Sequence, residues 1–330
     1  MQSEGAAALV FPDPLRYGVE LPLCERFAVL GYPLEVRTNS EQVIAAARES
    51  WGGHWKSEAG GQYLTVRVAV SGSEPGPTAV PVFRGQGSLL AIVASADDFA
   101  VCDYRCQFAY AFVREHTVAC RPFFRYHFLE SMVYASLTQS YFAPVHASCV
   151  AREGKGFLLC GESGAGKSTL AFACALRGWT FVCDDGTMAI RGSQTRKVAG
   201  KPGLIRLRED AARLFPVLAA RVAVPGVTGK PTIEVKTGEL PEIATAVECC
   251  IQYVLFLRRG AEGPPRFIPV KRHSAWARLA TTMPRFDPEI HPAQLETWRS
   301  LVEAETLEFH YGELGAAVNA LEQLAVARAQ

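Results

Sequence analysis

The sequence has no apolar run that approaches the ~18 residues of a membrane-spanning helix. Its first residues, MQSEGAAALVFPDP, also lack the basic start, apolar core and cleavage site of a secretory signal. We therefore expect a protein of the cytoplasm that has no membrane partner.

The sequence also has no surplus of one charge. Its 330 residues include 34 Lys and Arg and 33 Asp and Glu, which gives a formal net charge of +1. This balance gives no support to the binding of nucleic acid or of an anionic membrane. Hydrophobic residues make up 49% and charged residues 20%, as in ordinary globular proteins. The length suffices for one large or two medium domains.

The ten cysteines do not form a disulfide or zinc pattern. Cys102 and Cys106 have three residues between them, and neither a second matched pair nor a histidine cluster accompanies them. Four others lie inside apolar runs, which is typical of small buried side chains: Cys149, Cys160, Cys174 and Cys183. These features fit a reducing compartment.

The first third of the chain predicts a small α+β module. Strand-like alternations of apolar and polar residues occupy positions 34–39, 63–70, 88–95 and 107–113. A helical pattern covers residues 41–51, and Ser40 stands where a helix N-cap is expected. Glycine, proline and serine at 71–81 predict a loop or hinge.

A second helical pattern at residues 123–140 predicts a connector between two domains, which we place at 1–125 and 126–330. His127 lies in this helix among aromatic residues, so a structural role is favoured over a catalytic one. Beyond Ala143 the chain changes to short apolar runs with tight turns, and REGKG at 152–156 predicts a β-hairpin.

Residues 161–168, GESGAGKS, match the phosphate-binding pattern G-x-x-x-x-G-K-S/T. An apolar strand precedes this loop, and a helical run that Gly178 can end follows it. Glycines allow backbone N–H groups to surround a phosphate at a helix N-terminus. Lys167 is expected to reach the β- and γ-phosphates of ATP, and Ser168 to offer its hydroxyl to Mg²⁺. The alternative is a glycine-rich turn that matches by chance.

Two adjacent acids, Asp184 and Asp185, follow the next apolar run, TFVC. A right-handed crossover makes this strand parallel to the one before the loop, so both strands end at the same edge of the sheet. Neighbouring strand residues diverge, so one carboxylate can hold Mg²⁺ while the other accepts a proton from an attacking hydroxyl. The alternative for Asp-Asp-Gly is a solvated turn.

The segment HASCVAREGKGFLLCGESGAGKSTLAFACALRGWTFVCDD resembles the catalytic domain of the HPr kinase/phosphorylase superfamily, which is related to phosphoenolpyruvate carboxykinases. In that family a histidine-bearing strand, a hairpin, the loop, a helix and two aspartates follow in this order. The resemblance is specific over residues 144–190.

The resemblance implies catalytic roles for His146, Lys167 and Asp184, with Asp184 as the base, and a metal-binding role for Ser168 and Asp185. It also implies that Lys230 lies near the active site. The nucleotide-binding loop would then consist of Gly161, Glu162, Ser163, Gly164, Ala165, Gly166, Lys167, Ser168 and Thr169.

Two departures from the family argue against HPr as the acceptor and against phosphorolysis. Thr169 stands where bifunctional HPr kinases usually have glutamate, and their downstream R-G-L-G-I signature is absent. A basic cluster occurs there instead and is consistent with either charge stabilisation at a phosphoryl group or a solvated face: Arg196, Lys197, Lys201, Arg206 and Arg208. Trp276 and Trp298 lie on amphipathic helices and are interpreted as core residues.

The expected fold is α/β, a P-loop kinase-type domain like HPr kinase and phosphoenolpyruvate carboxykinase, preceded by the smaller module. The expected activity is an ATP- and Mg²⁺-dependent kinase that phosphorylates a hydroxyl, either a serine of a protein or peptide or a small molecule. The alternative is a regulatory protein gated by nucleotide without phosphotransfer. A transport ATPase is disfavoured because L-S-G-G-Q does not occur. Self-association of the chain stays open.

Overall fold

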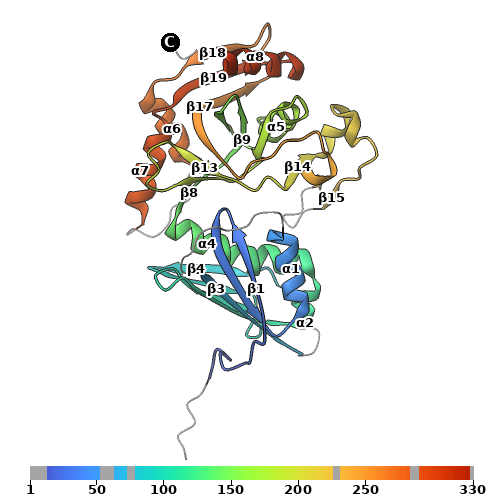
Figure 1. Cartoon of the computed structure of the whole chain (residues 1–330), viewed down its shortest axis with the longest axis vertical. Helices are drawn as coiled ribbons and strands as arrows, with labels where there is room; N and C mark the ends of the chain where they lie inside the picture. Colours follow the sequence, from blue (N-terminus) through green and yellow to red (C-terminus); the bar gives the residue numbers. More distant parts are fainter. Residues whose placement is uncertain (1–12, 53–62, 73–78, 226–230, 283–289, 328–330) are drawn as a thin grey trace, which may run out of the picture. The chain divides into compact units, whose positions relative to one another are not determined.

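The computed structural model describes residues 13–52, 63–72, 79–225, 231–282 and 290–327. The chain forms two compact units (Figure 1), the first of residues 1–28 and 33–136 and the second of residues 29–32 and 137–330. This division falls inside the expected connector helix, later than the boundary drawn at residue 125. No helix among the described residues is long and apolar enough to span a membrane.

The first unit has a seven-stranded sheet in the order β1-β2-β3-β7-β6-β5-β4. Strands β2, β3 and β7 are parallel neighbours, whereas β4 to β7 pair antiparallel. The strands are β1 (Leu23–Val29), β2 (Tyr32–Thr38), β3 (Leu64–Ser71), β4 (Val82–Gln86), β5 (Leu89–Val93), β6 (Phe99–Asp103) and β7 (Phe108–Arg114). The sequence predicted four of them and missed β1, β4 and β6.

Helix α1 (Glu41–Trp51) has the bounds that the sequence predicted. Val43, Ile44 and Ala47 lie on its buried face. Ser40 occupies the N-cap position with an extended backbone, but its side chain makes no capping hydrogen bond. The position of the N-cap was therefore predicted correctly, but the side-chain hydrogen bond expected of a capping serine is not formed.

The expected helix at 123–140 is confirmed as part of a continuous helical run over residues 121–140, which contains a π-helical segment. Helix α2 (Glu115–Ala119) is followed by α3 (Arg121–Phe124), a π-helical turn (Arg125–Glu130) and α4 (Ser131–Ser140). His127 lies in the π turn and is 8% exposed, as its structural interpretation predicted, and burial lowers its pKa. Phe123 packs beside its ring.

The second unit is α/β. Its main sheet has the order β11-β9-β10-β17-β13-β12-β8, and β19 extends it by pairing with β17 and with β18. The strands are β8 (Phe142–Val145), β9 (Ala147–Arg152), β10 (Lys155–Cys160), β11 (Thr180–Cys183), β12 (Thr187–Ile190), β13 (Lys197–Ala199), β17 (Glu248–Arg259), β18 (Arg266–Pro269) and β19 (Glu305–Tyr311). A smaller sheet contains β14 (Leu204–Arg208), β16 (Pro231–Lys236) and β15 (Val224–Pro225).

Each face of the main sheet is covered by its own hydrophobic cluster. Helices α5 (Lys167–Leu176) and α8 (Leu314–Val326) pack with the smaller sheet on one face, against Phe157, Leu159 and Leu255 among others. Helices α6 (Arg272–Thr282) and α7 (His291–Leu301) cover the other, where Leu158 and Val254 point. The alternation along β10 and β17 thus buries both faces. The short 3-10 turns are Glu209–Arg213, Pro216–Leu218 and Thr237–Glu239.

Several local predictions in this unit are confirmed. Glu153 and Gly154 have φ values of 50° and 73°, so the REGKG segment makes a two-residue hairpin turn between β9 and β10. Trp298 is fully buried and donates to the carbonyl of Pro144 at 3.1 Å, whereas Trp276 is only partly buried at the edge of the same core.

The cysteines behave as the composition indicated. All ten are free thiols, and those expected in the core (Cys149, Cys160, Cys174 and Cys183) are buried. Cys102 is buried and Cys106 exposed, so the close pair does not share one environment.

The strands before and after helix α5 are parallel, as predicted, but another strand lies between them. Strands β10 and β11 both pair antiparallel with β9, so they point in the same direction on either side of it. Their carboxyl ends therefore meet at one edge of the sheet.

Two truncations in helix α8 test this packing. Leu321 is fully buried, whereas Val326 on the same helix is 68% exposed. We expect Leu321→Ala to lower the free energy of unfolding of the second unit by about 2–5 kcal/mol, because it leaves a cavity. Val326→Ala should change it by less than about 0.5 kcal/mol. Urea titration followed by circular dichroism measures both, and equal effects would contradict the placement of α8.

Candidate functional site

The glycine-rich loop joins β10 to α5 and needs glycine at specific positions. Gly164 and Gly166 have φ values of 94° and 91°, a region that side-chain-bearing residues rarely adopt. A Cβ at Gly161 would stand 2.8 Å from the Cβ of Ala165. Gly166 caps the start of α5, so the loop opens onto a helix N-terminus.

Lys167 folds back over this loop. Its side chain is buried, and its Nζ donates to the carbonyls of Gly161 at 2.7 Å and Glu162 at 3.2 Å. A third contact, 3.1 Å long, reaches Nε2 of His146. Burial lowers the pKa of this amine, and the charge of Asp185 acts in the opposite direction.

His146 links the lysine to one of the paired aspartates. Its Nδ1 lies 2.7 Å from Oδ1 of Asp185. Because Lys167 has only hydrogens to offer, Nε2 accepts and Nδ1 carries the proton that is donated to Asp185. The expectation placed His146 within a strand. It lies instead at the bend between β8 and β9, where its side chain is 40% exposed.

Asp184 occupies a more enclosed position than Asp185, which is exposed. Its Oδ2 accepts the backbone N–H of Arg206 at 2.6 Å. Its carbonyl accepts from the hydroxyls of Ser148 and, at 3.4 Å, Ser168. Burial raises the pKa of the Asp184 carboxyl to about 6. The hydrogen bond from Arg206 acts in the opposite direction and lowers this pKa, but by less than burial raises it. The two carboxylates therefore have different surroundings, as their adjacent positions predicted.

Of the basic cluster predicted from the sequence, Arg208 reaches the loop with its side chain. Its Nη2 donates to Oγ of Ser163 at 3.2 Å, and its guanidinium nitrogens lie 3.7 Å from the place of a Cβ on Gly164. Arg206 contributes its backbone to Asp184, while its side chain pairs with Glu234 on β16.

Arg196 and Lys197 contact other parts of the second unit. Arg196 donates to the carbonyl of Ile251, and Lys197 pairs with Glu248 at 3.1 Å. Lys201 is exposed in the turn before β14. Lys230 lies outside the described residues.

Sequence reasoning missed three residues at this edge. Ser148 lies two positions after His146, so the strand alternation was a usable signal. Tyr311 and Arg259 end the strands β19 and β17, which run parallel to β10. A Cβ on Gly166 would stand 3.0 Å from the Tyr311 hydroxyl and 3.6 Å from Cδ of Arg259.

The donor set fits a nucleotide with a hard cation. The loop, Lys167 and Arg208 offer N–H groups and positive charge of the kind that bind phosphates. The hydroxyl of Ser168 and the carboxylate of Asp185 are oxygen ligands, which Mg²⁺ prefers while keeping several waters. No group of three or more His, Cys, Asp or Glu side chains in the described residues is arranged to hold a metal ion.

Comparison with known proteins gives limited matches. A family model described as SynChlorMet cassette protein ScmC matches residues 124–201, which include the loop and the aspartates. No curated protein sequence matches the chain. Among solved structures, the Hpr(Ser) kinase/phosphatase from Coxiella burnetii is similar, with 14% identity and a TM-score of 0.31. The match covers 55% of this chain and 96% of that one.

The raised pKa of Asp184 predicts a pH dependence of stability. A folded-state pKa near 6, above the ordinary 3.8, means that the protonated carboxyl stabilises the fold at low pH. This stabilisation is complete below about pH 4 and is lost as the pH rises through 6. Asp184→Asn should escape this loss, so its free energy of unfolding relative to wild type should rise by about 2 kcal/mol between pH 4 and 7. Urea titrations in magnesium-free buffer measure this difference, and a constant value would contradict the burial of Asp184.

Proposed function

We propose that this chain is an ATP- and Mg²⁺-dependent kinase of the P-loop, HPr kinase-like type, which transfers the γ-phosphoryl group to a hydroxyl. The acceptor would be a serine of a protein or peptide, or a small molecule. One observation carries the proposal: the half-buried Asp184 lies beside Ser168 at the end of the glycine-rich loop, and its neighbour Asp185 is tied through His146 to Lys167.

Asp184 is the proposed general base. A base with a pKa near 6 is deprotonated at neutral pH yet accepts a proton more readily than an ordinary aspartate. The backbone N–H of Arg206 fixes the orientation of this carboxylate through Oδ2. The alternative, a solvated turn, does not account for a carboxylate held in this way.

Lys167 and Arg208 are proposed to neutralise phosphate charge. Both are close to the loop, and each contacts only neutral groups there: Lys167 binds two carbonyls and an imidazole, and Arg208 a serine hydroxyl. Such pre-positioned cations stabilise charge that develops on the transferred group. His146 is a positioning residue that orients Asp185 through the 2.7 Å contact.

Ser168 and Asp185 are proposed to hold Mg²⁺. The metal ion, when bound with ATP, supplies positive charge to the phosphate oxygens and so favours departure of ADP. Asp185 is exposed, and Ser168 lies in the first turn of α5, directly after the glycine-rich loop.

Phosphoryl transfer is tested with γ-labelled ATP and a panel of hydroxyl acceptors. Asp184→Asn should lower kcat by about 10²–10⁴-fold, because it removes the base, while the Kd for ATP changes little. Lys167→Ala should weaken ATP binding, and Glu296→Gln, an exposed change on α7, should alter neither. Release of free phosphate with no labelled acceptor would contradict the kinase. A biological output that needs Lys167 but not Asp184 would favour the nucleotide-gated regulator.

The role of Arg208 has its own test. Arg208→Gln should reduce kcat by about 10–10³-fold with a smaller effect on the KM for ATP, because its charge matters most during transfer. Arg213→Gln removes an exposed arginine from the following turn and serves as the matched control. Steady-state kinetics distinguish the two, and equal rates in both variants would remove Arg208 from the mechanism.

A further inference from the structure

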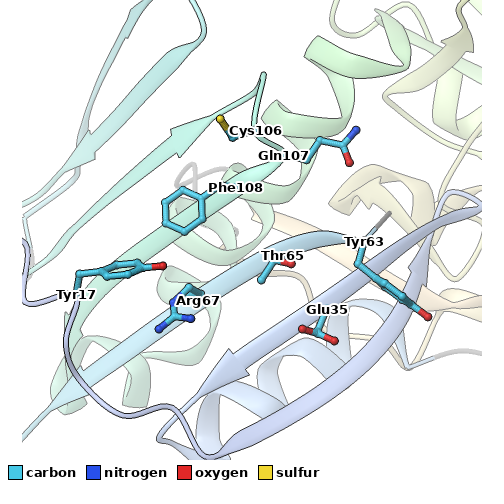
Figure 2. Close-up of a pocket in the computed structure, with 8 residues that line it drawn as sticks. All are labelled: Tyr17, Glu35, Tyr63, Thr65, Arg67, Cys106, Gln107 and Phe108. Atoms are coloured by element: carbon cyan, nitrogen blue, oxygen red, sulfur yellow. The ribbon is translucent and has the colours of Figure 1, made fainter. Parts of the chain in front are cut away.

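The first unit contains a pocket of about 410 Å³ on one face of its sheet (Figure 2). Its floor consists of three side chains that lie side by side across three strands. Glu35 on β2 pairs in register with Thr65 on β3, and Thr65 pairs with Phe108 on β7. The opposite face of these strands carries fully or nearly fully buried residues such as Val36 and Val66. The floor therefore lies on the other face of the sheet, where Phe108 packs at the edge of a small hydrophobic cluster of Ala69, Tyr110 and Phe112.

Aromatic rings enclose two ends of this pocket. The ring centroids of Tyr17 and Phe108 are 5.9 Å apart. The guanidinium carbon of Arg67 lies over the Tyr17 ring, 4.6 Å from its centroid. Tyr63 stands at the other end, beneath the guanidinium of Arg26 at 4.6 Å. Figure 2 shows Thr65 and Arg67 between these ends. A flat apolar group would find aromatic partners at either end.

The one carboxylate in the lining is already neutralised. Glu35 is 5% exposed and receives hydrogen bonds from Arg37 at 2.6 Å and Arg26 at 3.1 Å. The Arg37 hydrogen bond lowers the pKa of Glu35, and Arg26 adds to this effect, so the group is ionised at neutral pH. Two arginines on one carboxylate leave a surplus positive charge at this end of the pocket.

Arg67 adds a second positive charge, for which the described residues provide no ion-pair partner. Among the described residues, no carboxylate lies within ion-pair distance of its guanidinium, and its buried Nε has no hydrogen-bond partner. A guanidinium in this state lacks the planar acceptor that its paired N–H groups favour. The surplus charge and the neighbouring rings together define the chemistry of a ligand.

We propose that this pocket binds a small organic anion in which a carboxylate is joined to an aromatic ring. The carboxylate pairs with Arg67 and with the surplus charge around Glu35, and the ring lies against Tyr17 and Phe108. Inorganic phosphate shares the charge but lacks the ring. The site lies within the first unit, so it does not depend on phosphotransfer at the loop.

Saturation-transfer NMR and calorimetry on the full chain test the proposal with four probes: phenylacetate, its neutral analogue phenylacetamide, acetate and inorganic phosphate. Phenylacetate should bind at least about tenfold more tightly than the other three. Arg67→Gln should weaken phenylacetate binding by about tenfold or more, because a hydrogen-bonded charge pair is lost. Arg84→Gln, at an exposed position of β4 on the same sheet, should leave it unchanged.

Binding of phenylacetate that is equal in wild type and Arg67→Gln would overturn the proposal, and so would its absence at about 10 mM. If phenylacetamide bound as tightly as phenylacetate, the negative charge of the ligand would not determine its affinity. If phosphate bound as tightly as phenylacetate and required Arg67, the aromatic ring would not determine it. Arg67→Lys keeps the charge without the planar donors and should show an intermediate affinity. Thermal unfolding of each variant establishes that the first unit is folded.

Discussion

Four strands of the second unit, β11, β10, β17 and β19, point in one direction, and their carboxyl ends meet at one edge of the sheet. The loop follows β10, the aspartates follow β11, and Arg259 and Tyr311 end the other two. Parallel strands concentrate side chains from distant parts of the chain in this way. The antiparallel strand β9 separates β10 from β11 and begins one residue after His146. The strand directions therefore account for most of the candidate site.

Sequence alone located the parts of the site that depend on local patterns. The loop requires glycine at positions 164 and 166 for their backbone conformation, and the aspartates follow an apolar strand at a fixed distance. Long-range register was not readable: nothing in the sequence joins Ser148 to Asp184, or Tyr311 to Gly166. The contact of the Arg208 side chain with Ser163 of the loop was not readable either, because it depends on how β14 pairs with β16.

The first unit was less predictable. Its apolar central strands, β3 and β7, were evident from composition, but the exposed strand β4 has no buried residue and so no alternation to detect. The helix before β8 was predicted, but its π-helical segment was not, because apolar spacings of three and four indicate a helix without specifying its type. The stacking of Arg67 on Tyr17 joins residues fifty positions apart, which no local pattern encodes.

The hydrogen bonds of Lys167 have a consequence for any ligand of the loop. An ammonium group has three hydrogens, and Gly161, Glu162 and His146 provide three acceptors for them. An anion that binds this amine must take the place of one of these acceptors, so it gains only the difference between the new contact and the old one. If a phosphate binds the amine of Lys167, the free energy of that contact is therefore reduced by the cost of breaking the hydrogen bond that it replaces.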